Sequence, residues 1–342
     1  MKRLIIKDGY QSVLDTMTTQ KAIKFVKDRF QKELSTALNL TRVSAPLFVK
    51  PETGLNDNLN GYERIVSFDL LNDKDANGKM QVVEVVQSLA KWKRYALNRY
   101  GFKAGSGLYT DMNAIRRDEE TDSIHSIYVD QWDWERVINR EDRNIDFLKG
   151  IVRKIYGAIK ATAVATKEAY PALKGLNLPE DITFVTTQQM LDECPTMTPT
   201  EREGYFAKKY GAIFIQGIGW ELSNGEPHDG RAADYDDWNL NGDIMVWNDV
   251  LGIGYELSSM GIRVDAKSLK AQSEHKHEEY KLESPYAKGV LEDTLPLTIG
   301  GGIGQSRLCM LMLEKMHIGE VQVSVWPKED TDKLEKANIY VL

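Results

Sequence analysis

Residues 300–307, Gly-Gly-Gly-Ile-Gly-Gln-Ser-Arg, have the types and the spacing that suit the binding of a phosphorylated ligand. Three consecutive glycines remove every Cβ from a strand end, so a ligand can lie directly against the backbone. Arg307 follows on the first turn of an apolar helix, and a cation beside a glycine floor favours a nucleotide phosphate that lies across it. The segment is not a P-loop, because no Lys-Ser or Lys-Thr pair closes it, and no βαβ unit follows to make a dinucleotide fingerprint.

Two carboxylates upstream of the glycines are candidates for a metal site. Asp243 opens one apolar strand and Glu256 closes the next, so a hairpin-like pairing would bring the two side chains together. Hard carboxylate oxygens on rigid strands, with substrate phosphate completing the shell, are usual ligands of magnesium. The alternative is a pair of charges on a solvated sheet face, which the apolar residues around them disfavour. We therefore predict that Asp243 and Glu256 bind Mg²⁺.

A third cluster, at 128–135, interleaves acids and an amide with two tryptophans, in the order Tyr-Val-Asp-Gln-Trp-Asp-Trp-Glu. On a strand, Gln131 and Asp133 share one face because side chains alternate with a period of two. A buried carboxylate there would need a cationic partner, such as a substrate ammonium group. The alternative is a tryptophan-rich core whose acids face water, and the residues alone leave both interpretations open.

Three shorter clusters carry charge that is either functional or merely solvated. Arg116 ends an apolar stretch and precedes acids, a pattern that by itself is more often a solvated turn. Residues 231–238 form an acidic, aromatic loop shortly before Asp243. Ser88 begins a basic helix on which the amide donors and Lys93 suit a carboxylate ligand.

These groups need a scaffold, and the apolar periodicity predicts an α+β fold with a central, mostly antiparallel sheet flanked by helices. Strands separated by helices and long excursions, without regular βαβ alternation, favour that class. No repeat or Pro/Gly/Ser-rich linker divides the chain, so we expect one domain over 1–342, with an N-terminal extension at 1–15 and a charged, helical insertion at about 265–283. The periodicity predicts helices at about 18–39, 88–100 and 145–170, and strands at about 80–87, 124–130, 182–185, 212–216, 243–247, 254–257 and 295–299.

The composition limits the class of protein. The chain has 342 residues, of which 42% are hydrophobic and 28% charged, enough for a large core. Its formal net charge of -7 argues against a general nucleic-acid binder, which would show a basic excess. Cys194 and Cys309 form neither a disulfide framework nor a zinc pattern. With no signal peptide and no membrane span in the sequence, we expect a soluble, cytoplasmic protein.

Taken together, the clusters resemble the three signature motifs of class II aminoacyl-tRNA synthetases. The first helix with Val-Ser-Ala-Pro at 43–46 is similar to motif 1, whose proline ends a strand of the dimer interface. Arg-Arg-Asp-Glu at 116–119 resembles the Arg-x-Glu of motif 2, and the glycine run with Arg307 resembles motif 3. Each short motif is weak, but their order and the acidic strand pair between them are more specific.

A closer resemblance, to the ammonia-dependent asparagine synthetases or aspartate–ammonia ligases, covers nearly the whole chain. Strings of the length seen here rarely coincide by chance. The chain departs from that family in its N-terminal extension and in the composition of the insertion after Asp265, and we expect neither to touch a motif. The resemblance is carried by residues 57–59 (Asp-Asn-Leu), 88–94, 128–135, 234–238 (Asp-Tyr-Asp-Asp-Trp), 240–244, 256–263 and the glycine run.

The resemblance implies ATP-driven activation of the β-carboxylate of L-aspartate to aspartyl-adenylate and pyrophosphate, after which ammonia releases asparagine and AMP. It also implies a homodimer with Mg²⁺ and with no nucleic-acid or membrane partner. It implies catalytic roles for Asp57, Arg116, Gln131 and Asp236. Aspartate or asparagine would bind Ser88, Lys93, Arg116, Gln131, Asp133, Asp236, Ser259 and Gly301, whereas ATP or AMP would bind Arg116, Ile124, Asp243, Glu256, Ser258, Arg263, Gly302 and Arg307.

Within these sets, the chemistry assigns expected roles. Arg116 and magnesium would neutralise the α-phosphate, and Arg307 and Arg263 would steer the β/γ tail. Backbone groups of 124–126 would contact adenine. Ammonia enters mostly as ammonium at neutral pH, so Asp57 and Asp236 are the acids that would attract it and accept its proton. We expect Lys93 and Ser88 to bind the α-carboxylate of aspartate and Asp133 and Gln131 its ammonium, pairings that can be permuted within the same set.

Two rival interpretations remain from the sequence. An aspartyl- or asparaginyl-tRNA synthetase is disfavoured, because no anticodon-binding domain precedes the helix near residue 18 and the acidic balance offers no track for tRNA. A regulatory subunit that binds ligand without chemistry would be expected to lose the catalytic arginines or the metal-binding acids. Arg116, Asp243, Glu256 and Arg307 are all present.

Overall fold

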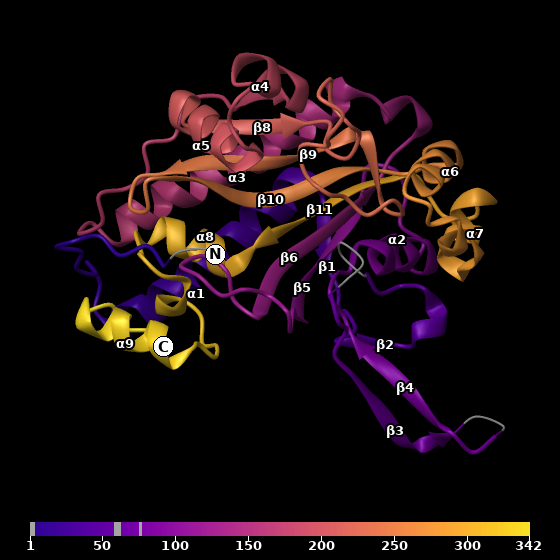
Figure 1. Ribbon diagram of the computed structural model, residues 1–342, viewed down its shortest axis with the longest axis horizontal. Coiled ribbons are helices and arrows are strands. Elements are labelled where there is room, and N and C mark those ends of the chain that lie inside the picture. Colours follow the sequence, from indigo (N-terminus) through magenta and orange to yellow (C-terminus); the bar gives the residue numbers. More distant parts are fainter. Residues whose placement is uncertain (1–3, 58–62, 75–76) are drawn as a thin grey trace.

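The computed structural model describes residues 4–57, 63–74 and 77–342. Its centre is a large sheet in which the outermost pair at each edge is parallel and the other described pairs are antiparallel (Figure 1). This arrangement confirms the predicted α+β class with a mostly antiparallel sheet. In spatial order the strands are β1 (Leu40–Arg42), β5 (Gly107–Ile115), β6 (Tyr128–Val137), β11 (Thr298–Gly304), β10 (Ile253–Arg263), β9 (Asp236–Asn248), β8 (Ala212–Gln216) and β7 (Thr183–Thr186).

Two long helices, α1 (Thr16–Leu38) and α3 (Ile145–Ala169), pack against each other and form the main core with one face of the sheet. The ring of Phe30 on α1 lies 4.8 Å from that of Trp132 on β6, so the tryptophans of β6 point into this core. Strand alternation then turns Gln131 and Asp133 to the opposite face of the sheet. The open question about the 128–135 cluster is thus answered, since the tryptophans form core and Asp133 lies on the other face, whereas Asp130 is on the side of α1 and bonds to Lys27 at 3.0 Å.

The ends of α1 and α2 show how local hydrogen bonds set the helix boundaries. The helix α1 begins after Asp15, whose Oδ1 accepts from the Thr18 amide at 2.9 Å, so the helix starts earlier than the predicted residue 18. Its predicted end is confirmed, because Asn39 adopts the left-handed conformation at φ 56. The helix predicted from Ser88 is α2 (Ala90–Arg99), and the Ser88 Oγ accepts from the Ala90 amide at 3.1 Å.

Two strand predictions were wrong at their boundaries for identifiable reasons. The strand expected at 124–130 begins only at Tyr128, because Asp122 Oδ1 accepts from the amides of Ile124 and His125 at 2.8 Å each and bends the chain into a turn. The strand expected at 295–299 is β11, which begins at Thr298 and runs through the glycines themselves. The glycines lie inside the sheet, between β6 and β10, rather than after it.

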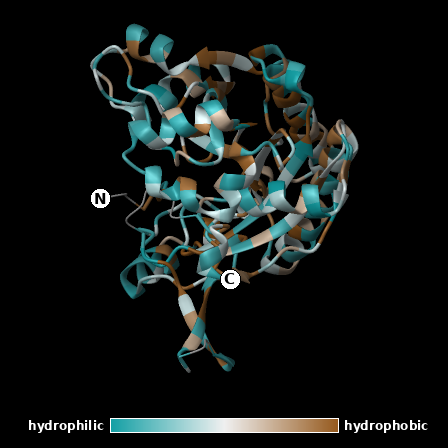
Figure 2. Ribbon diagram, turned by 90° about the vertical axis from the view of Figure 1, so that its right-hand side faces the viewer, coloured by the Kyte–Doolittle hydropathy of each residue, from teal (hydrophilic) through white to brown (hydrophobic). Residues whose placement is uncertain are grey.

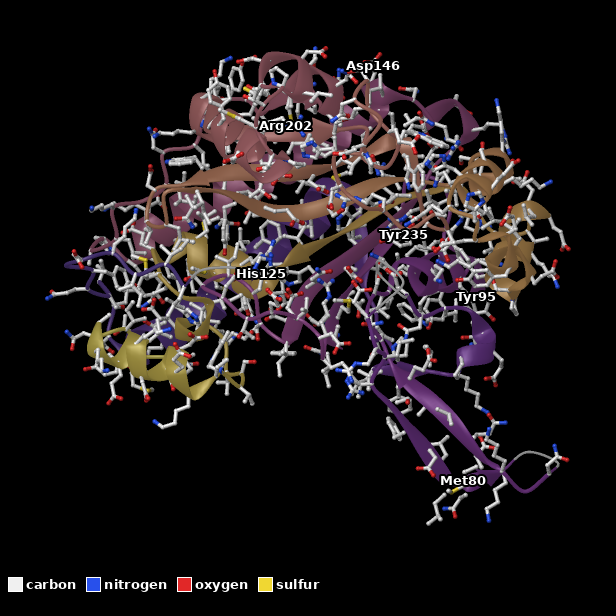
Figure 3. The ribbon with its side chains drawn as sticks, viewed as in Figure 1. Met80, Tyr95, His125, Asp146, Arg202 and Tyr235 are labelled. Atoms are coloured by element: carbon white, nitrogen blue, oxygen red, sulfur yellow. The ribbon has the colours of Figure 1, made fainter. Side chains whose placement is uncertain are left out.

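Some elements were not predicted at all, among them β5 and two short helices, α4 (Thr187–Glu193) and α5 (Pro199–Tyr210), whereas the strand predicted at about 182–185 is β7, shifted by one residue. The strand predicted at about 80–87 is β4 (Met80–Val85), but the long arm that it forms with β2 (Phe48–Val49) and β3 (Ser67–Lys74) on either side was not predicted. The arm projects from the rest of the molecule in two perpendicular views (Figures 1 and 2), and Met80 lies near its tip (Figure 3).

The helical insertion expected at 265–283 is confirmed as α6 (Ala266–His275) and a 3-10 turn at Glu279–Glu283, followed by α7 (Pro285–Leu291). The chain after β11 forms α8 (Gln305–Met312) and α9 (Lys328–Lys336). In the described ranges, no helix has both the length and the apolar character needed to cross a bilayer.

Candidate active site

A polar cleft lies on the face of the sheet opposite α1 and α3, over β6, β11 and β10. Strand register explains its floor, because Gly302 pairs with Asp133 on one side and with Ser259 on the other. Figure 3 shows His125 and Tyr235 well apart along the cleft. The lining includes fourteen of the sixteen site residues predicted from the sequence, namely Asp57, Ser88, Lys93, Arg116, Ile124, Gln131, Asp133, Asp236, Glu256, Ser259, Arg263, Gly301, Gly302 and Arg307.

The remaining two predicted residues do not line the cleft. Ser258 pairs with Ile303 and Ile244, which are both fully buried in the core, so its side chain turns to that face of the sheet and its predicted contact with ATP is wrong in this geometry. Asp243 stands behind the guanidinium of Arg231, with which it forms an ion pair. Asn58 and Leu59, from the string at 57–59, lie outside the described residues.

Gly300 and Gly302 leave room for polar side chains to lie over strand β11. A Cβ at Gly302 would lie 2.2 Å from Gln131 Oε1 and 2.7 Å from Asp133 Oδ1, so the absence of a side chain lets these polar groups lie over the strand. A Cβ at Gly301 would instead meet Met260 Cβ at 2.6 Å. We had expected Gly301 and Gly302 both to bare the backbone to ligand, and for Gly301 that is wrong. Gly301 contributes its carbonyl group instead.

Lys93 of α2 bonds to the backbone of the glycine run at Gly301. Its side chain is 1% exposed, and its Nζ donates to the Gly301 carbonyl at 2.9 Å. The Nζ also lies 3.4 Å from Asp133 Oδ1 and 4.0 Å from Glu135 Oε2. Burial lowers the pKa of Lys93. The ammonium is therefore held close to the acids of β6, at the position expected for a group that receives a carboxylate.

Arg263 links two acids in a fully buried network. Its Nε and Nη2 donate to Glu135 at 3.0 and 2.7 Å, and its Nη1 bonds to Asp236. Burial alone would raise the pKa of Glu135, but the Arg263 guanidinium holds it below its usual value. For Asp236, burial outweighs Arg263 and the pKa is raised. Because both acids occupy Arg263, the predicted steering of the β/γ-phosphates does not fit its geometry.

The acidic segment at 234–237 is not the solvated loop that such sequences usually form. Asp234 bonds to Lys91 at 2.9 Å, and Asp237 bonds to Arg143 at 2.7 Å. Lys91 and the two carboxylates are buried, and the Arg143 side chain is 9% exposed. Each acid therefore has its own cation from a distant part of the chain, which fixes the segment against the cleft.

At the other end of the cleft, the Arg307 guanidinium contacts two side chains, those of Glu256 and His125. Its Nη1 donates to the Glu256 carboxylate at 3.1 Å, and its Nη2 lies 2.9 Å from His125 Nε2. The other ring nitrogen, Nδ1, lies 2.8 Å from Asp122 Oδ1. Burial alone would raise the pKa of Asp122, but its bonds to His125 bring the pKa below its usual value. The sequence assigned residues 124–126 only backbone contacts, and it missed this Asp122–His125–Arg307 chain.

Asp243 and Glu256 fit the predicted magnesium site only in part, because Arg231 bonds to Asp243 and Arg307 bonds to Glu256. The β9–β10 pairing brings them together, and Oδ1 of Asp243 is buried without a hydrogen-bond partner in the described part of the chain. Burial raises the pKa of Asp243 to about 7. Burial alone would also raise the pKa of Glu256, but the Arg307 guanidinium holds it below its usual value. No cluster of three or more metal-ligating side chains exists among the described residues, so phosphate oxygens would have to complete the shell.

Arg116 stands apart from the other cations of the cleft. Its backbone amide donates to the Ile127 carbonyl at 2.8 Å, which fixes the turn between β5 and β6. Its guanidinium has no ion pair within the described residues, and its Nε is buried without a hydrogen-bond partner there. Arg64 holds the turn from outside by bonding to Asp118 Oδ1 at 3.0 Å. A cation fixed in a cleft without an anion is prepared to receive one from a ligand.

Sequence reasoning missed the cleft residue Tyr235 and two residues that bond to cleft or metal-site groups, Glu135 and Arg231. Glu135 continues the period-two series of Gln131 and Asp133, and extending that series would have identified it. Tyr235 lies within a string that was already singled out, but no local signal sets its direction. Arg231 was quoted at the start of the acidic loop without a role, since only the folded chain brings it to Asp243.

The fold and this cleft define a protein with the catalytic fold of class II aminoacyl-tRNA synthetases. Asparaginyl-tRNA synthetase from Pyrococcus horikoshii, complexed with asparaginyl-adenylate, superposes with a TM-score of 0.65 at 13% identity, covering 90% of this chain and 70% of that one. The enzyme from Entamoeba histolytica, also with asparaginyl-adenylate, gives a TM-score of 0.62 at 12% identity, covering 90% and 66%. At these identities the likeness shows the fold alone.

The family follows from closer relatives. The family model described as aspartate-ammonia ligase matches residues 17–338. A relative from Bacillus cytotoxicus, named aspartate–ammonia ligase, is 56% identical over 332 residues, which is 97% of this chain and 99% of the relative. A relative of the same name from Bacillus cereus strain AH187 is 56% identical with the same coverage. The chain belongs to the aspartate–ammonia ligase family.

Proposed function

We propose that this cleft carries out both steps of an ATP-dependent aspartate–ammonia ligase. The protein converts L-aspartate and ammonia into L-asparagine through aspartyl-adenylate, with release of AMP and pyrophosphate. The observation that carries the assignment is the Arg116 guanidinium, which has no ion pair within the described ranges and lines the same cleft as the Lys93–Asp133 pair and Arg307. Such a cleft offers cations for phosphate and carboxylate and acids for an amino group.

In the first step, a β-carboxylate oxygen of aspartate forms a bond to the α-phosphorus of ATP while the bond to pyrophosphate breaks. Two negatively charged groups must approach each other, so fixed positive charge at the α-phosphate lowers the barrier. Arg116 supplies that charge. Arg307 binds the nucleotide between His125 and Glu256, and residues 124–126 border the adenine.

The other end of the cleft binds the amino acid. Lys93 and Ser88 receive the α-carboxylate, and Asp133 with Gln131 receives the α-ammonium. The geometry around Gly302 supports this pairing, because Gln131 Oε1 and Asp133 Oδ1 both point at the strand there. Arg263 serves this end as well, by holding Asp236 and Glu135 in place.

In the second step, ammonia attacks the acyl carbon of the adenylate and the carbon–oxygen bond to AMP breaks. Ammonium must first lose a proton, and the candidates are Asp57 and Asp236, which both line the cleft. Burial raises the pKa of Asp236, which makes this carboxylate a better proton acceptor than an exposed aspartate. Asp57 contributes negative charge at the same end, close to Lys91 and Tyr235.

Three further features belong to the proposal. Asp243 and Glu256 would hold Mg²⁺, which when bound supplies positive charge to the phosphates. A homodimer is supported by β1, which forms one edge of the large sheet, and by exposed apolar side chains nearby, Leu47 and Phe48. A cytoplasmic location without nucleic-acid partners is supported by the two free, buried cysteines and the net charge of -7.

Pyrophosphate release tests the proposed function directly. Purified protein with Mg²⁺, ATP, aspartate and ammonium, but without tRNA, is expected to release pyrophosphate and to form asparagine and AMP in equal amounts. Leaving out ammonium should stop turnover, while aspartate-dependent exchange of pyrophosphate into ATP continues. A requirement for tRNA would instead indicate the synthetase alternative, and binding without turnover would indicate a regulatory subunit.

The two floor glycines give a paired prediction. Gly302→Ala is expected to fold and to lose about 10²-fold in kcat/KM for aspartate, because its Cβ displaces the movable ends of Gln131 and Asp133. Gly301→Ala is expected to lower the melting temperature instead, because its Cβ meets Met260 and the Ser259 carbonyl in the sheet. Thermal unfolding and aspartate kinetics on both variants distinguish these effects. Equal loss of stability in both variants would contradict the conclusion that a Cβ at Gly302 would point to the cleft and a Cβ at Gly301 to the core.

A further inference from the structure

The insertion at 265–283 was expected to touch no motif, and the structure contradicts this through one side chain of α6. The Gln272 amide is fully buried and makes three hydrogen bonds to the backbone of the acidic segment. Its Oε1 accepts from the Trp238 amide at 3.0 Å, and its Nε2 donates to the carbonyls of Ala233 at 3.0 Å and Asp236 at 2.9 Å. One side chain therefore spans residues 233–238 from end to end.

The spanned segment presents two groups to the cleft. Tyr235 and Asp236 line it, and Asp236 bonds to the Arg263 guanidinium. The segment enters the sheet here, because Asp236 pairs with Arg263 at the start of β9. A shift of its backbone would therefore move the carboxylate of Asp236 relative to Arg263 and to any bound substrate.

The helix that carries Gln272 is itself fixed to the same network by Arg143. The Arg143 Nη2 donates to Asp237 at 2.7 Å, and its Nη1 bonds to the Arg263 carbonyl. Its Nε lies 3.4 Å from Asp265, the N-cap of α6, whose Oδ1 accepts from the Ser268 amide at 2.9 Å. Helix α6 is thus held at its start by Arg143 and is joined to the acidic segment by Gln272 two turns later.

We propose that Gln272 is a positioning residue that holds Asp236 and Tyr235 at the amino-acid and ammonium end of the cleft. The inference rests on the role of Asp236 in the proposed function. Two of the three hydrogen bonds are donated by the amide nitrogen to carbonyls that flank Tyr235, so the amide group and not only its volume is required. The ATP end, with Arg307 and His125, has no direct contact with this network among the described residues.

The test measures KM separately for ammonium, aspartate and ATP in Gln272→Met and Gln272→Glu. Methionine keeps the length without hydrogen bonds, and glutamate keeps the acceptor for Trp238 but loses both donors. Both variants are expected to raise KM for ammonium and aspartate about tenfold, the size of one lost buried hydrogen bond, with KM for ATP within about twofold. Equal increases for all three substrates, or unchanged ammonium and aspartate values in folded protein, would overturn the proposal.

Two more variants make the result specific. Asn241→Leu is a control for the loss of a buried amide, because the Asn241 side chain is 1% exposed and bonds to the amide and carbonyl of Ile218 at 2.9 and 2.8 Å, and not to the backbone of the acidic segment. It is expected to lose stability without the selective change in KM. Asp236→Asn tests the underlying role. If it raises both KM values and the Gln272 variants do not, the inference alone fails, whereas no effect of Asp236→Asn would refute the role assigned to Asp236 and the inference with it.

Discussion

Arg116→Ala is expected to lower the rate of aspartate-dependent pyrophosphate exchange by about 10²–10³-fold, the effect of removing one preorganised donor from a transition state. The reason is geometric, since Arg116 is the cleft arginine whose guanidinium has no ion pair within the described residues, so its charge is not already neutralised. Arg307 and Arg263 cannot replace it, because both are bonded to carboxylates. The exchange rate should fall through kcat, since the charge acts as the phosphate bond changes.

The neighbouring Arg117 provides a matched control for this substitution. Its side chain is exposed and does not line the cleft, so Arg117→Ala should retain near-normal exchange. Circular dichroism and thermal unfolding of both variants would show that the fold is intact. An Arg116→Ala protein with near-normal turnover would refute the role given to Arg116, and an equal loss in both variants would point to an effect of net charge rather than position.

Much of the fold was predictable because its signals are local. The two long helices follow from apolar spacing, and Asn39 ends the first of them as its tolerance of the left-handed conformation predicts. Other boundaries depend on single side-chain contacts, such as those of Asp122, which delay the start of β6. The strand β5 was missed because it lies between two strands inside the sheet, where burial on both faces removes the alternation that marks a strand.

The site could be predicted where its residues follow from period and motif, and not where partners come from far along the chain. Gln131 and Asp133 share a face as predicted, and the glycine floor lies beneath them. The cations that neutralise the acids of 234–237 come from residues 91, 143 and 263, and no local pattern links them. That is why the residues alone left open whether the segment is solvated, although every acid in it is buried and paired.

The buried ion pairs of the site also affect the stability of the fold. Among their cations, Arg263 bonds to two carboxylates. Two carboxylates, Glu135 and Asp236, share this one guanidinium, and their side chains are 0% and 4% exposed. Arg263→Met is expected to lower the free energy of unfolding by about 3–5 kcal/mol at neutral pH, because it leaves buried charge without a partner. By contrast, Arg42→Met breaks an exposed pair with Asp111 and should cost less than about 1 kcal/mol. Urea denaturation measures both.

The free energy of unfolding of the Arg263→Met variant is expected to depend on pH differently from that of the wild type. In the wild type, burial alone would raise the pKa of Glu135 but Arg263 holds it below its unfolded value, so this residue contributes stability at neutral pH that is lost as pH falls through the folded pKa. Without Arg263, burial alone dominates and the pKa values of both Glu135 and Asp236 lie above their unfolded values. The folded variant then binds more protons than the unfolded chain, so this contribution to its stability is present at low pH and is lost as pH rises.

The difference in the free energy of unfolding between the wild type and the variant should therefore be smallest near about pH 4 and largest near pH 7. A difference that stays constant over this range would show that lost packing, and not uncompensated charge, explains the effect of Arg263.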